Sequence, residues 1–430
     1  MAKQAESETD PQTAAAVFAG LSIEAMLHDR YDGSDARDIF AKVEGFKLTE
    51  QARAVGLYPF FQPLDRNDGP EAEIHGRRVV MLGSNNYLGL TRHPRVLEAA
   101  RDAINEHGTS LTGSRLLNGT THLHERLENK IAEFLGAEAA LVFTTGYQTN
   151  LGVISSLVNR RSVAVVDKAD HASIYDACRL AEGQMLRFRH NDPQHLDTIL
   201  RRVGEDKTSL VVIDGVFSMG GDIADLPGIV EVCRRHQVRL LVDDAHAIGV
   251  IGLGGRGTAS HFGIEGGVDL TVGTFSKSFA SVGGFVAGSR SVLEWIKHFG
   301  RSMIFSASLP PASAAAALAA LEVLIEEPER VETVQRKGAM LRDGLSDMGF
   351  DTGDSQTPII PVTIGDELAT VTFWRDLLEC GVYTNPVIFP AVGMGKALLR
   401  TSCMATHEDE QIESSLEKFQ ALGRKHGLLP

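Results

Sequence analysis

The 430-residue chain has few cysteines, a deficit of positive charge and no long hydrophobic segment. Its four cysteines are scattered without Cys-x-x-Cys spacing, so neither a disulfide framework nor a zinc site is expected, and the reducing cytoplasm fits this composition. Lysine and arginine total 42 against 56 acidic residues, which gives a net charge of −14. This balance argues against a nucleic-acid-binding surface, and an anionic substrate would need a local cluster of positive charge.

The N-terminal region also lacks the features of a targeting or membrane segment. Residues 1–10 are acidic and have no apolar signal-peptide core, and no uncharged apolar run in the chain reaches transmembrane length. Residues 1–12 predict disorder, whereas 13–29 have mixed helical periodicity and could pack on the body of the protein, on a partner subunit or on a membrane. A further amphipathic helix is expected at about 36–56. Any membrane contact is therefore expected to be peripheral.

Short apolar runs alternate with helical patterns between residues 139 and 290. Continuous apolar strands separated by helices indicate an α/β fold, with a mostly parallel central sheet covered by helices on both faces. The expected strands are 140–143, 163–166, 210–213, 240–242, 270–272 and 285–287, and the expected helices include 146–158, 172–182 and 226–237.

The two ends of the chain have a different organisation. An Ala-rich helix at about 312–326 leads to a C-terminal region whose mixed helices and strands predict a small α+β domain. We therefore expect three units: an N-terminal extension and arm (1–90), a large α/β domain (91–315) and a small C-terminal domain (316–430).

One lysine, Lys277, interrupts a small and apolar stretch that runs from 268 to 288. Hydroxyls of Thr274 and Ser276 flank its amine. Because an apolar setting disfavours the ammonium form, it lowers the pKa of a lysine, which can then form a Schiff base with an aldehyde. The alternative is an exposed lysine on a Ser/Gly loop.

A second apolar run ends at Asp243, and His246 follows it. The carboxyl ends of strands in an open α/β sheet form the ligand crevice, so these two side chains are expected to point toward the same place as Lys277. A carboxylate there can keep a pyridinium nitrogen protonated. The combination of such an aspartate with a Schiff-base lysine indicates pyridoxal 5′-phosphate (PLP) as cofactor.

Two more candidates follow expected strands. Gly146 and Tyr147 lie where a strand leads into a helix, and backbone N–H groups with the helix dipole favour an anion such as phosphate there; an ordinary N-cap is the alternative. His171 lies at the carboxyl edge of the sheet, where an imidazole could stack on a flat ring, although a lone histidine is more often structural.

Three polar residues outside these strand ends are also candidates. Asn86 lies in a turn after an apolar run, where amides could line a site. Ser306 could equally be a phosphate donor or a plain turn residue. Arg400 carries a guanidinium on an apolar strand, which indicates a carboxylate partner; a structural ion pair is the alternative.

Taken together, these segments resemble the α-oxoamine synthases, fold-type I PLP-dependent transferases that condense an amino acid with an acyl thioester and release carbon dioxide. The resemblance spans about residues 45–425. Residues 113–120 and 188–191 are most similar to the bacterial serine palmitoyltransferase branch of the family. The motifs that carry the resemblance are Asn86–Gly89, Thr145–Tyr147, Asp170–Ser173, Asp214–Met219, Asp243–His246, Gly273–Lys277 and Ser306–Pro311.

The resemblance implies a role for each candidate residue. Lys277 would bind PLP covalently and Asp243 would pair with the ring nitrogen. His246 would meet the ring oxygen and His171 would stack on the ring. The implied phosphate-binding residues are Gly146, Tyr147, Thr274, Ser276 and Ser306, with Ser306 supplied by the other subunit of a homodimer with shared active sites, and the implied substrate-binding residues are Asn86 and Arg400.

The resemblance also implies the substrates: an amino acid and an acyl thioester from coenzyme A or an acyl carrier protein. L-Serine with a long-chain acyl group is favoured, which would give a 3-ketosphinganine-type aminoketone of sphingolipid synthesis. However, bacterial serine enzymes carry an arginine where this chain aligns Ile388, and 389–392 is similar to enzymes that use glycine or alanine, such as 2-amino-3-ketobutyrate ligase and 8-amino-7-oxononanoate synthase. That alternative stays open.

Two further alternatives are less consistent with the motifs. An aminotransferase would share Lys277 and Asp243 but would not need the loop 108–121. A non-catalytic regulatory subunit should have lost Lys277, which this chain retains.

Overall fold

The computed structural model describes residues 38–40, 48–204 and 206–430. The expected disorder of residues 1–12 and the expected helix 13–29 lie outside the described residues. Of the expected helix 36–56, residues 48–54 form α4 (Leu48–Ala54), whereas the described residues 38–40 and 55–56 are not helical.

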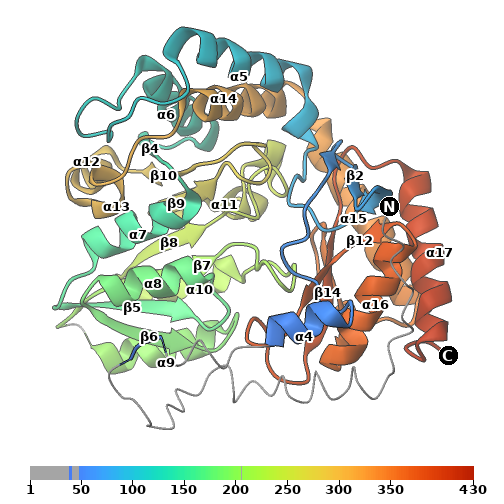
Figure 1. Cartoon of the computed structure of the whole chain (residues 1–430). Helices are drawn as coiled ribbons and strands as arrows, with labels where there is room; N and C mark the ends of the chain where they lie inside the picture. The colour runs from blue at the N-terminus through green and yellow to red at the C-terminus, as the bar shows by residue number, and fades with distance from the viewer. Residues whose placement is uncertain (1–37, 41–47, 205) are drawn as a thin grey trace.

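A seven-stranded sheet lies at the centre of the protein, in the order β4-β10-β9-β8-β7-β5-β6 (Figure 1). The five strands from β9 to β6 run parallel, and only β10 pairs antiparallel with both of its neighbours. The mostly parallel sheet expected from the sequence is therefore confirmed. The strands are β4 (Ala139–Phe143), β5 (Ser162–Asp167), β6 (Gln184–Phe188), β7 (Thr208–Asp214), β8 (Arg239–Asp243), β9 (Leu270–Thr274) and β10 (Gly284–Gly288).

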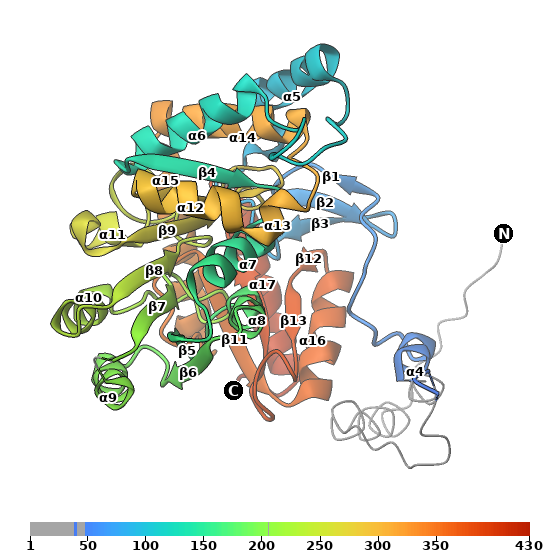
Figure 2. The ribbon, with the colours of Figure 1, turned by 90° about the vertical axis from the view of Figure 1, so that its left-hand side faces the viewer.

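Side chains of the parallel strands alternate between two buried faces. On β7, Leu210 and Val212 belong to one hydrophobic cluster with α7 and α8, whereas Val211 and Ile213 belong to another with α9 and α10. Figure 2 shows the strands stacked between these two helical layers. Burial of both faces explains why these strands have continuous apolar sequences. The helices are α7 (Gly146–Leu157), α8 (Ala172–Leu180), α9 (Pro193–Val203) and α10 (Leu226–Arg235).

Three long helices cover the β4–β10 end of the sheet. They are α5 (Pro94–His107), α6 (His122–Leu135) and α14 (Pro311–Glu326), which pack on one another at the top of Figure 1. Their shared core includes Val142 of β4 and Phe285 of β10. The other elements between residues 90 and 304 are η1 (Leu90–Arg92), η2 (Leu253–Gly255), α11 (Thr258–His261), η3 (Glu265–Gly267), α12 (Arg290–Phe299) and α13 (Arg301–Ile304).

The C-terminal region has a core of its own. A three-stranded sheet, in the order β11-β14-β13, packs with three helices. Leu57 and Leu82 of the N-terminal arm belong to the same cluster, so the arm packs onto the C-terminal region. These elements are α15 (Glu329–Met348), β11 (Ile359–Gly365), α16 (Glu367–Glu379), β13 (Asn385–Val387), β14 (Ala397–Ser402) and α17 (Asp409–Lys425).

The N-terminal arm is also joined to the C-terminal region through a strand pair. The arm forms β1 (Arg66–Asn67), β2 (Glu71–Ile74) and β3 (Arg77–Met81), and β3 pairs in parallel with β12 (Val382–Tyr383). The expected boundaries near residues 90 and 315 remain a prediction. Among the helices that the structure describes, none has both the length and the apolar character needed to cross a membrane.

Candidate active site

The carboxyl ends of the parallel strands meet at one edge of the sheet, and a cavity of about 310 Å³ opens there. Asp243 ends β8, Thr274 ends β9, and Lys277 follows in the loop to β10. The volume lies within the range of small-molecule sites. Eight of the candidate residues line it: Gly146, Tyr147, His171, Asp243, His246, Thr274, Ser276 and Lys277.

The carboxylate of Asp243 is buried and held by two hydrogen bonds. Its Oδ2 accepts from Asn150 Nδ2 at 2.6 Å, and its Oδ1 accepts from the backbone N–H of Ala245 at 3.0 Å. Asn150 is absent from the candidates predicted from the sequence. The available signal is its position on α7, one turn after Gly146, where a polar residue occupies a buried position.

Lys277 lies on a loop that aromatic residues fix to the protein core. Phe275 stacks on Phe285 with ring centroids 5.5 Å apart, and Phe279 packs edge-on against Phe275. Burial lowers the pKa of Lys277 to about 8, although the charges of Asp243 and Asp214 act in the opposite direction. A larger share of neutral amine than in an ordinary lysine is therefore available for Schiff-base formation.

The start of α7 and the end of β9 form a cradle for an anion. Thr145 caps α7 by accepting the backbone N–H of Gln148 at 3.1 Å, and the first N–H groups of the helix remain without intrahelical partners. A Cβ on Gly146 would lie 2.9 Å from Thr274 Oγ1, so glycine allows the helix to approach β9. Thr274 Oγ1 in turn lies 2.9 Å from Ser276 Oγ. A helix N-terminus beside two hydroxyls suits a phosphate group.

Two histidines line the same cavity. His171 caps α8, with its Nδ1 2.7 Å from Ser173 Oγ, and burial lowers the pKa of His171. His246 is buried with its Nδ1 2.8 Å from the hydroxyl of Tyr87. Burial, reinforced by the positive charge of Lys277, holds the pKa of His246 well below its usual value, so this imidazole is neutral at physiological pH.

Two of the residues predicted to bind phosphate make other contacts. The hydroxyl of Tyr147 bonds to Asp176, so the backbone N–H of Tyr147 at the start of α7 is the group that can face a phosphate. Ser306 accepts a hydrogen bond from Gln148 Nε2 at 3.0 Å and is not among the residues that line the Lys277 cavity of its own chain.

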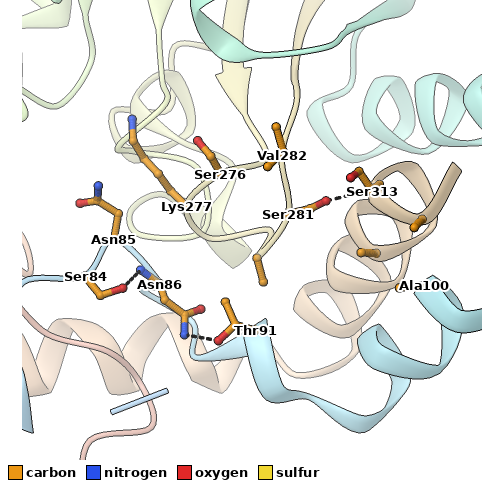
Figure 3. Close-up of a pocket in the computed structure, with 13 residues that line it drawn as sticks. Ser84, Asn85, Asn86, Thr91, Ala100, Ser276, Lys277, Ser281, Val282 and Ser313 are labelled. Atoms are coloured by element: carbon orange, nitrogen blue, oxygen red, sulfur yellow. Dashed lines mark hydrogen bonds between the residues drawn. The ribbon is translucent and has the colours of Figure 1, made fainter. Parts of the chain in front are cut away.

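A second cavity of about 500 Å³ adjoins the first and shares Lys277 and Ser276 (Figure 3). Asn85 and Asn86 line it. Asn86 donates to Thr91 Oγ1 at 2.9 Å, and among the described residues its buried Oδ1 has no hydrogen-bond partner. Lys277 therefore borders both a cavity with the features of a cofactor site and an open cavity through which a substrate can reach its amine.

Arg400 lies in the middle of β14 and is buried. Its Nε donates to the carbonyl of Ser218 at 2.6 Å, and its Nη2 donates to Asn85 Oδ1 at 3.0 Å and to the Tyr87 hydroxyl at 3.3 Å. All of these acceptors are neutral, and no carboxylate among residues 38–40, 48–204 and 206–430 forms an ion pair with Arg400. Within the described part of the chain, Arg400 therefore does not form the structural ion pair that was the alternative for this residue.

The family model for class I and II aminotransferases matches residues 77–419. The chain belongs to this family and, within it, to the α-oxoamine synthases. It is 45% identical over 378 residues to the serine palmitoyltransferase of Sphingobacterium spiritivorum, covering 88% of this chain and 95% of that protein. It is 40% identical over 381 residues to the 8-amino-7-oxononanoate synthase of Thermoanaerobacter pseudethanolicus, covering 88% of this chain and 96% of that protein.

Solved structures agree with this assignment. The serine palmitoyltransferase of Sphingomonas wittichii matches with a TM-score of 0.89 at 40% identity, over 91% of this chain and all of that one. A structure described as SPT with PLP internal aldimine matches with a TM-score of 0.89 at 38% identity, over the same shares of the two chains.

The residues at the cavity fit PLP. The N-terminus of α7 with Thr274 and Ser276 suits its phosphate, Asp243 suits its ring nitrogen, and the amine of Lys277 suits its aldehyde. The close approach of Gly146 to Thr274 leaves no room for a side chain at position 146.

Proposed function

We propose that this chain is a PLP-dependent C-acyltransferase that condenses L-serine with a long-chain acyl thioester and releases carbon dioxide. The observation that carries this proposal is the buried, uncompensated guanidinium of Arg400, which bonds to Asn85 at the wall of the cavity that contains Lys277. A buried charge of this kind calls for an anionic ligand, and the carboxylate of an amino acid matches its planar fork.

The eight candidate residues that line the cavity would hold the cofactor. Lys277 would bond to the aldehyde carbon, Asp243 would keep the ring nitrogen protonated, and His171 would lie against the ring. His246 would face the ring oxygen. The phosphate would be bound by the backbone at Gly146 and Tyr147 and by the hydroxyls of Thr274 and Ser276. When bound, PLP supplies the electron sink that stabilises a carbanion at the α-carbon of the amino acid.

The chain's own groups then direct the reaction. Arg400 and Asn86 orient the amino acid, with its amine toward the position of Lys277. Once the substrate amine has displaced it, the Lys277 amine can take the α-proton, because burial has brought its pKa to about 8. The α-carbon forms a bond to the thioester carbonyl, the thiol leaves, and loss of carbon dioxide followed by protonation of the α-carbon gives the aminoketone.

Serine is favoured over glycine and alanine because several of the most similar relatives are serine palmitoyltransferases. Ile388 favours the second candidate, a glycine- or alanine-using synthase. This residue packs against the C-terminal core and offers no charge to a substrate, and relatives of the 8-amino-7-oxononanoate synthase type are also similar to the chain.

The proposal is tested by incubating the PLP-loaded enzyme with serine, glycine or alanine and with thioesters of several acyl lengths, on coenzyme A or on a carrier protein. We expect the serine-derived aminoketone by mass spectrometry, with one carbon dioxide and one free thiol per product. If product forms only from glycine or alanine, the enzyme is the second candidate, a glycine- or alanine-using synthase. An amino-group exchange product without carbon dioxide would indicate an aminotransferase.

We also propose that the enzyme is a homodimer with shared active sites. Leu117 is 78% exposed and Phe305 is 72% exposed, and they lie on two segments joined by a hydrogen bond from Ser308 N–H to the carbonyl of Gly113 at 2.9 Å. Large apolar side chains exposed together on adjacent segments support a protein interface. Ser306 lies between Phe305 and Ser308. A second copy of the chain that covers this surface would therefore bring its Ser306 close to the Lys277 cavity of the first copy.

Mixing two inactive variants tests the shared site. Lys277→Ala and Ser306→Trp chains, refolded together, should form heterodimers in which one of the two sites carries both changes and the other carries neither. About a quarter of the wild-type activity is expected from a random mixture of the two chains. If native mass spectrometry verifies the heterodimers and no activity returns, the sites are not shared.

A further inference from the structure

Tyr87 joins the proposed carboxylate site to the proposed cofactor site. Its side chain is fully buried in the turn that follows β3. Its hydroxyl lies 2.8 Å from His246 Nδ1, 3.3 Å from Arg400 Nη2 and 3.2 Å from Asn85 Oδ1. His246 and Arg400, from distant parts of the chain, and the neighbouring Asn85 therefore meet at one oxygen atom.

The chemistry of these groups restricts where the protons lie. A guanidinium can only donate, so Arg400 donates to the Tyr87 oxygen. The single Tyr87 proton then has two possible acceptors, His246 Nδ1 and Asn85 Oδ1. The amide oxygen is farther away and already accepts from Arg400 at 3.0 Å. The contact to His246 Nδ1 is the shorter of the two, at 2.8 Å, which favours Nδ1 as the acceptor of this proton.

We propose that Tyr87 is a positioning residue, which donates to Nδ1 of His246 and thereby keeps the ring proton on Nε2, aimed at the ring oxygen of the cofactor. The cofactor-facing part of this inference rests on the proposed function. The tautomer itself is a property of the chain alone.

The ionisation of both residues supports this arrangement. Burial raises the pKa of Tyr87 although Arg400 acts in the opposite direction, so the hydroxyl keeps its proton and can donate. Burial and the charges of Lys277 and Arg400 keep the pKa of His246 low, so the ring has one proton and two possible tautomers. With the opposite tautomer, Nε2 would offer the ring oxygen an acceptor in place of a donor.

The arrangement also couples substrate binding to the cofactor. Hydrogen bonds in a chain polarise one another, so the donation from Arg400 strengthens the donation from Tyr87 to His246. A carboxylate that binds Arg400 weakens the polarisation of the Tyr87 hydroxyl by the guanidinium. Substrate binding would therefore weaken the hydrogen bond from Tyr87 to His246.

The test is the tautomer of His246 in the cofactor-free protein, measured by NMR on protein labelled with ¹³C,¹⁵N-histidine. The signal is assigned by its loss in His246→Gln. We expect a single Nε2–H tautomer in the wild type and a mixture in Tyr87→Phe. Tyr175→Phe is the matched control, because its hydroxyl donates to the carbonyl of Asp167 at 3.0 Å, away from His246, and it should leave the signal unchanged.

Each outcome decides the inference. An Nδ1–H tautomer in the wild type overturns it, and this measurement needs no variant to fold. An unchanged tautomer in a folded Tyr87→Phe protein also overturns it. In the PLP-loaded enzyme, kcat is expected to fall by up to about tenfold in Tyr87→Phe, the loss of one hydrogen bond, with little change in KM for the thioester. Failure of the proposed condensation would leave the NMR result unaffected, so the two failures can be told apart.

Discussion

We expect the Lys277→Ala protein to lose condensation activity by at least about 10⁴-fold, because the same amine holds the cofactor and moves the α-proton. PLP should still bind, since the phosphate cradle and Asp243 remain. Borohydride treatment should fix a pyridoxyl group on wild-type Lys277 and leave none on the variant. Lys168→Ala is the matched control, because this exposed lysine lies in the loop after β5 at the same edge of the sheet.

The pH dependence of cofactor attachment gives a second measure of the same residue. Burial lowers the pKa of Lys277 to about 8, and only the neutral amine attacks an aldehyde. The rate at which cofactor-free protein acquires bound PLP should therefore rise with pH and reach half of its maximum near pH 8. A midpoint near that of an exposed lysine, or a pyridoxyl group mapped to another lysine, would contradict the assignment.

The part of the site that lies at strand ends is predictable from the sequence. A parallel sheet places the carboxyl ends of its strands at one edge, so the apolar runs before Asp243 and Thr274 are sufficient to predict that these residues lie close together. The structure places both along one cavity with Lys277. The roles of these residues in catalysis remain proposals that the variants above test.

Contacts between side chains of distant elements were not predictable in this way. Asn150 bonds Asp243 from a helix on another part of the sheet, and Tyr87 reaches His246 only because the N-terminal arm packs beside the central domain. The pairing of Val80 with Val382 likewise depends on tertiary packing rather than on local pattern. Periodicity reports which face of an element is buried, not which partner covers it.

Two elements of the central domain were missed for a local reason. The strand β6, Gln184–Phe188, lies at the edge of the sheet and contains the polar residues Gln184 and Arg187, so it lacks the continuous apolar run by which the other strands are recognised. The helix α9 that follows it is strongly amphipathic with a polar outer face. An edge strand needs fewer apolar side chains than a central strand because less of it is buried, as the partly exposed β6 and the fully buried β5 show.

Arg400 provides the largest expected effect on substrate binding. Its guanidinium is buried and bonded to three neutral acceptors, so no carboxylate among the described residues offsets its charge. Charge-assisted hydrogen bonds contribute about 1.5–3 kcal/mol each, so Arg400→Ala should weaken serine binding by at least about tenfold. Affinity for PLP should change little, because its phosphate and ring contacts lie on other residues.

Ethanolamine, which is serine without its carboxylate, separates this effect from a general disturbance of the site. In the wild type, serine should bind more tightly than ethanolamine, and in Arg400→Ala and Arg400→Gln this difference should collapse. Arg400→Lys keeps the charge but loses the planar fork, so it should restore only part of the difference. Arg375→Gln, which changes an arginine that pairs with Asp376 elsewhere in the C-terminal region, is the control. The affinities are measured by titrating serine or ethanolamine into the PLP-loaded enzyme and following the visible spectrum of the cofactor. An equal loss for serine and ethanolamine would mean that Arg400 supports the fold of the site rather than the carboxylate of the substrate.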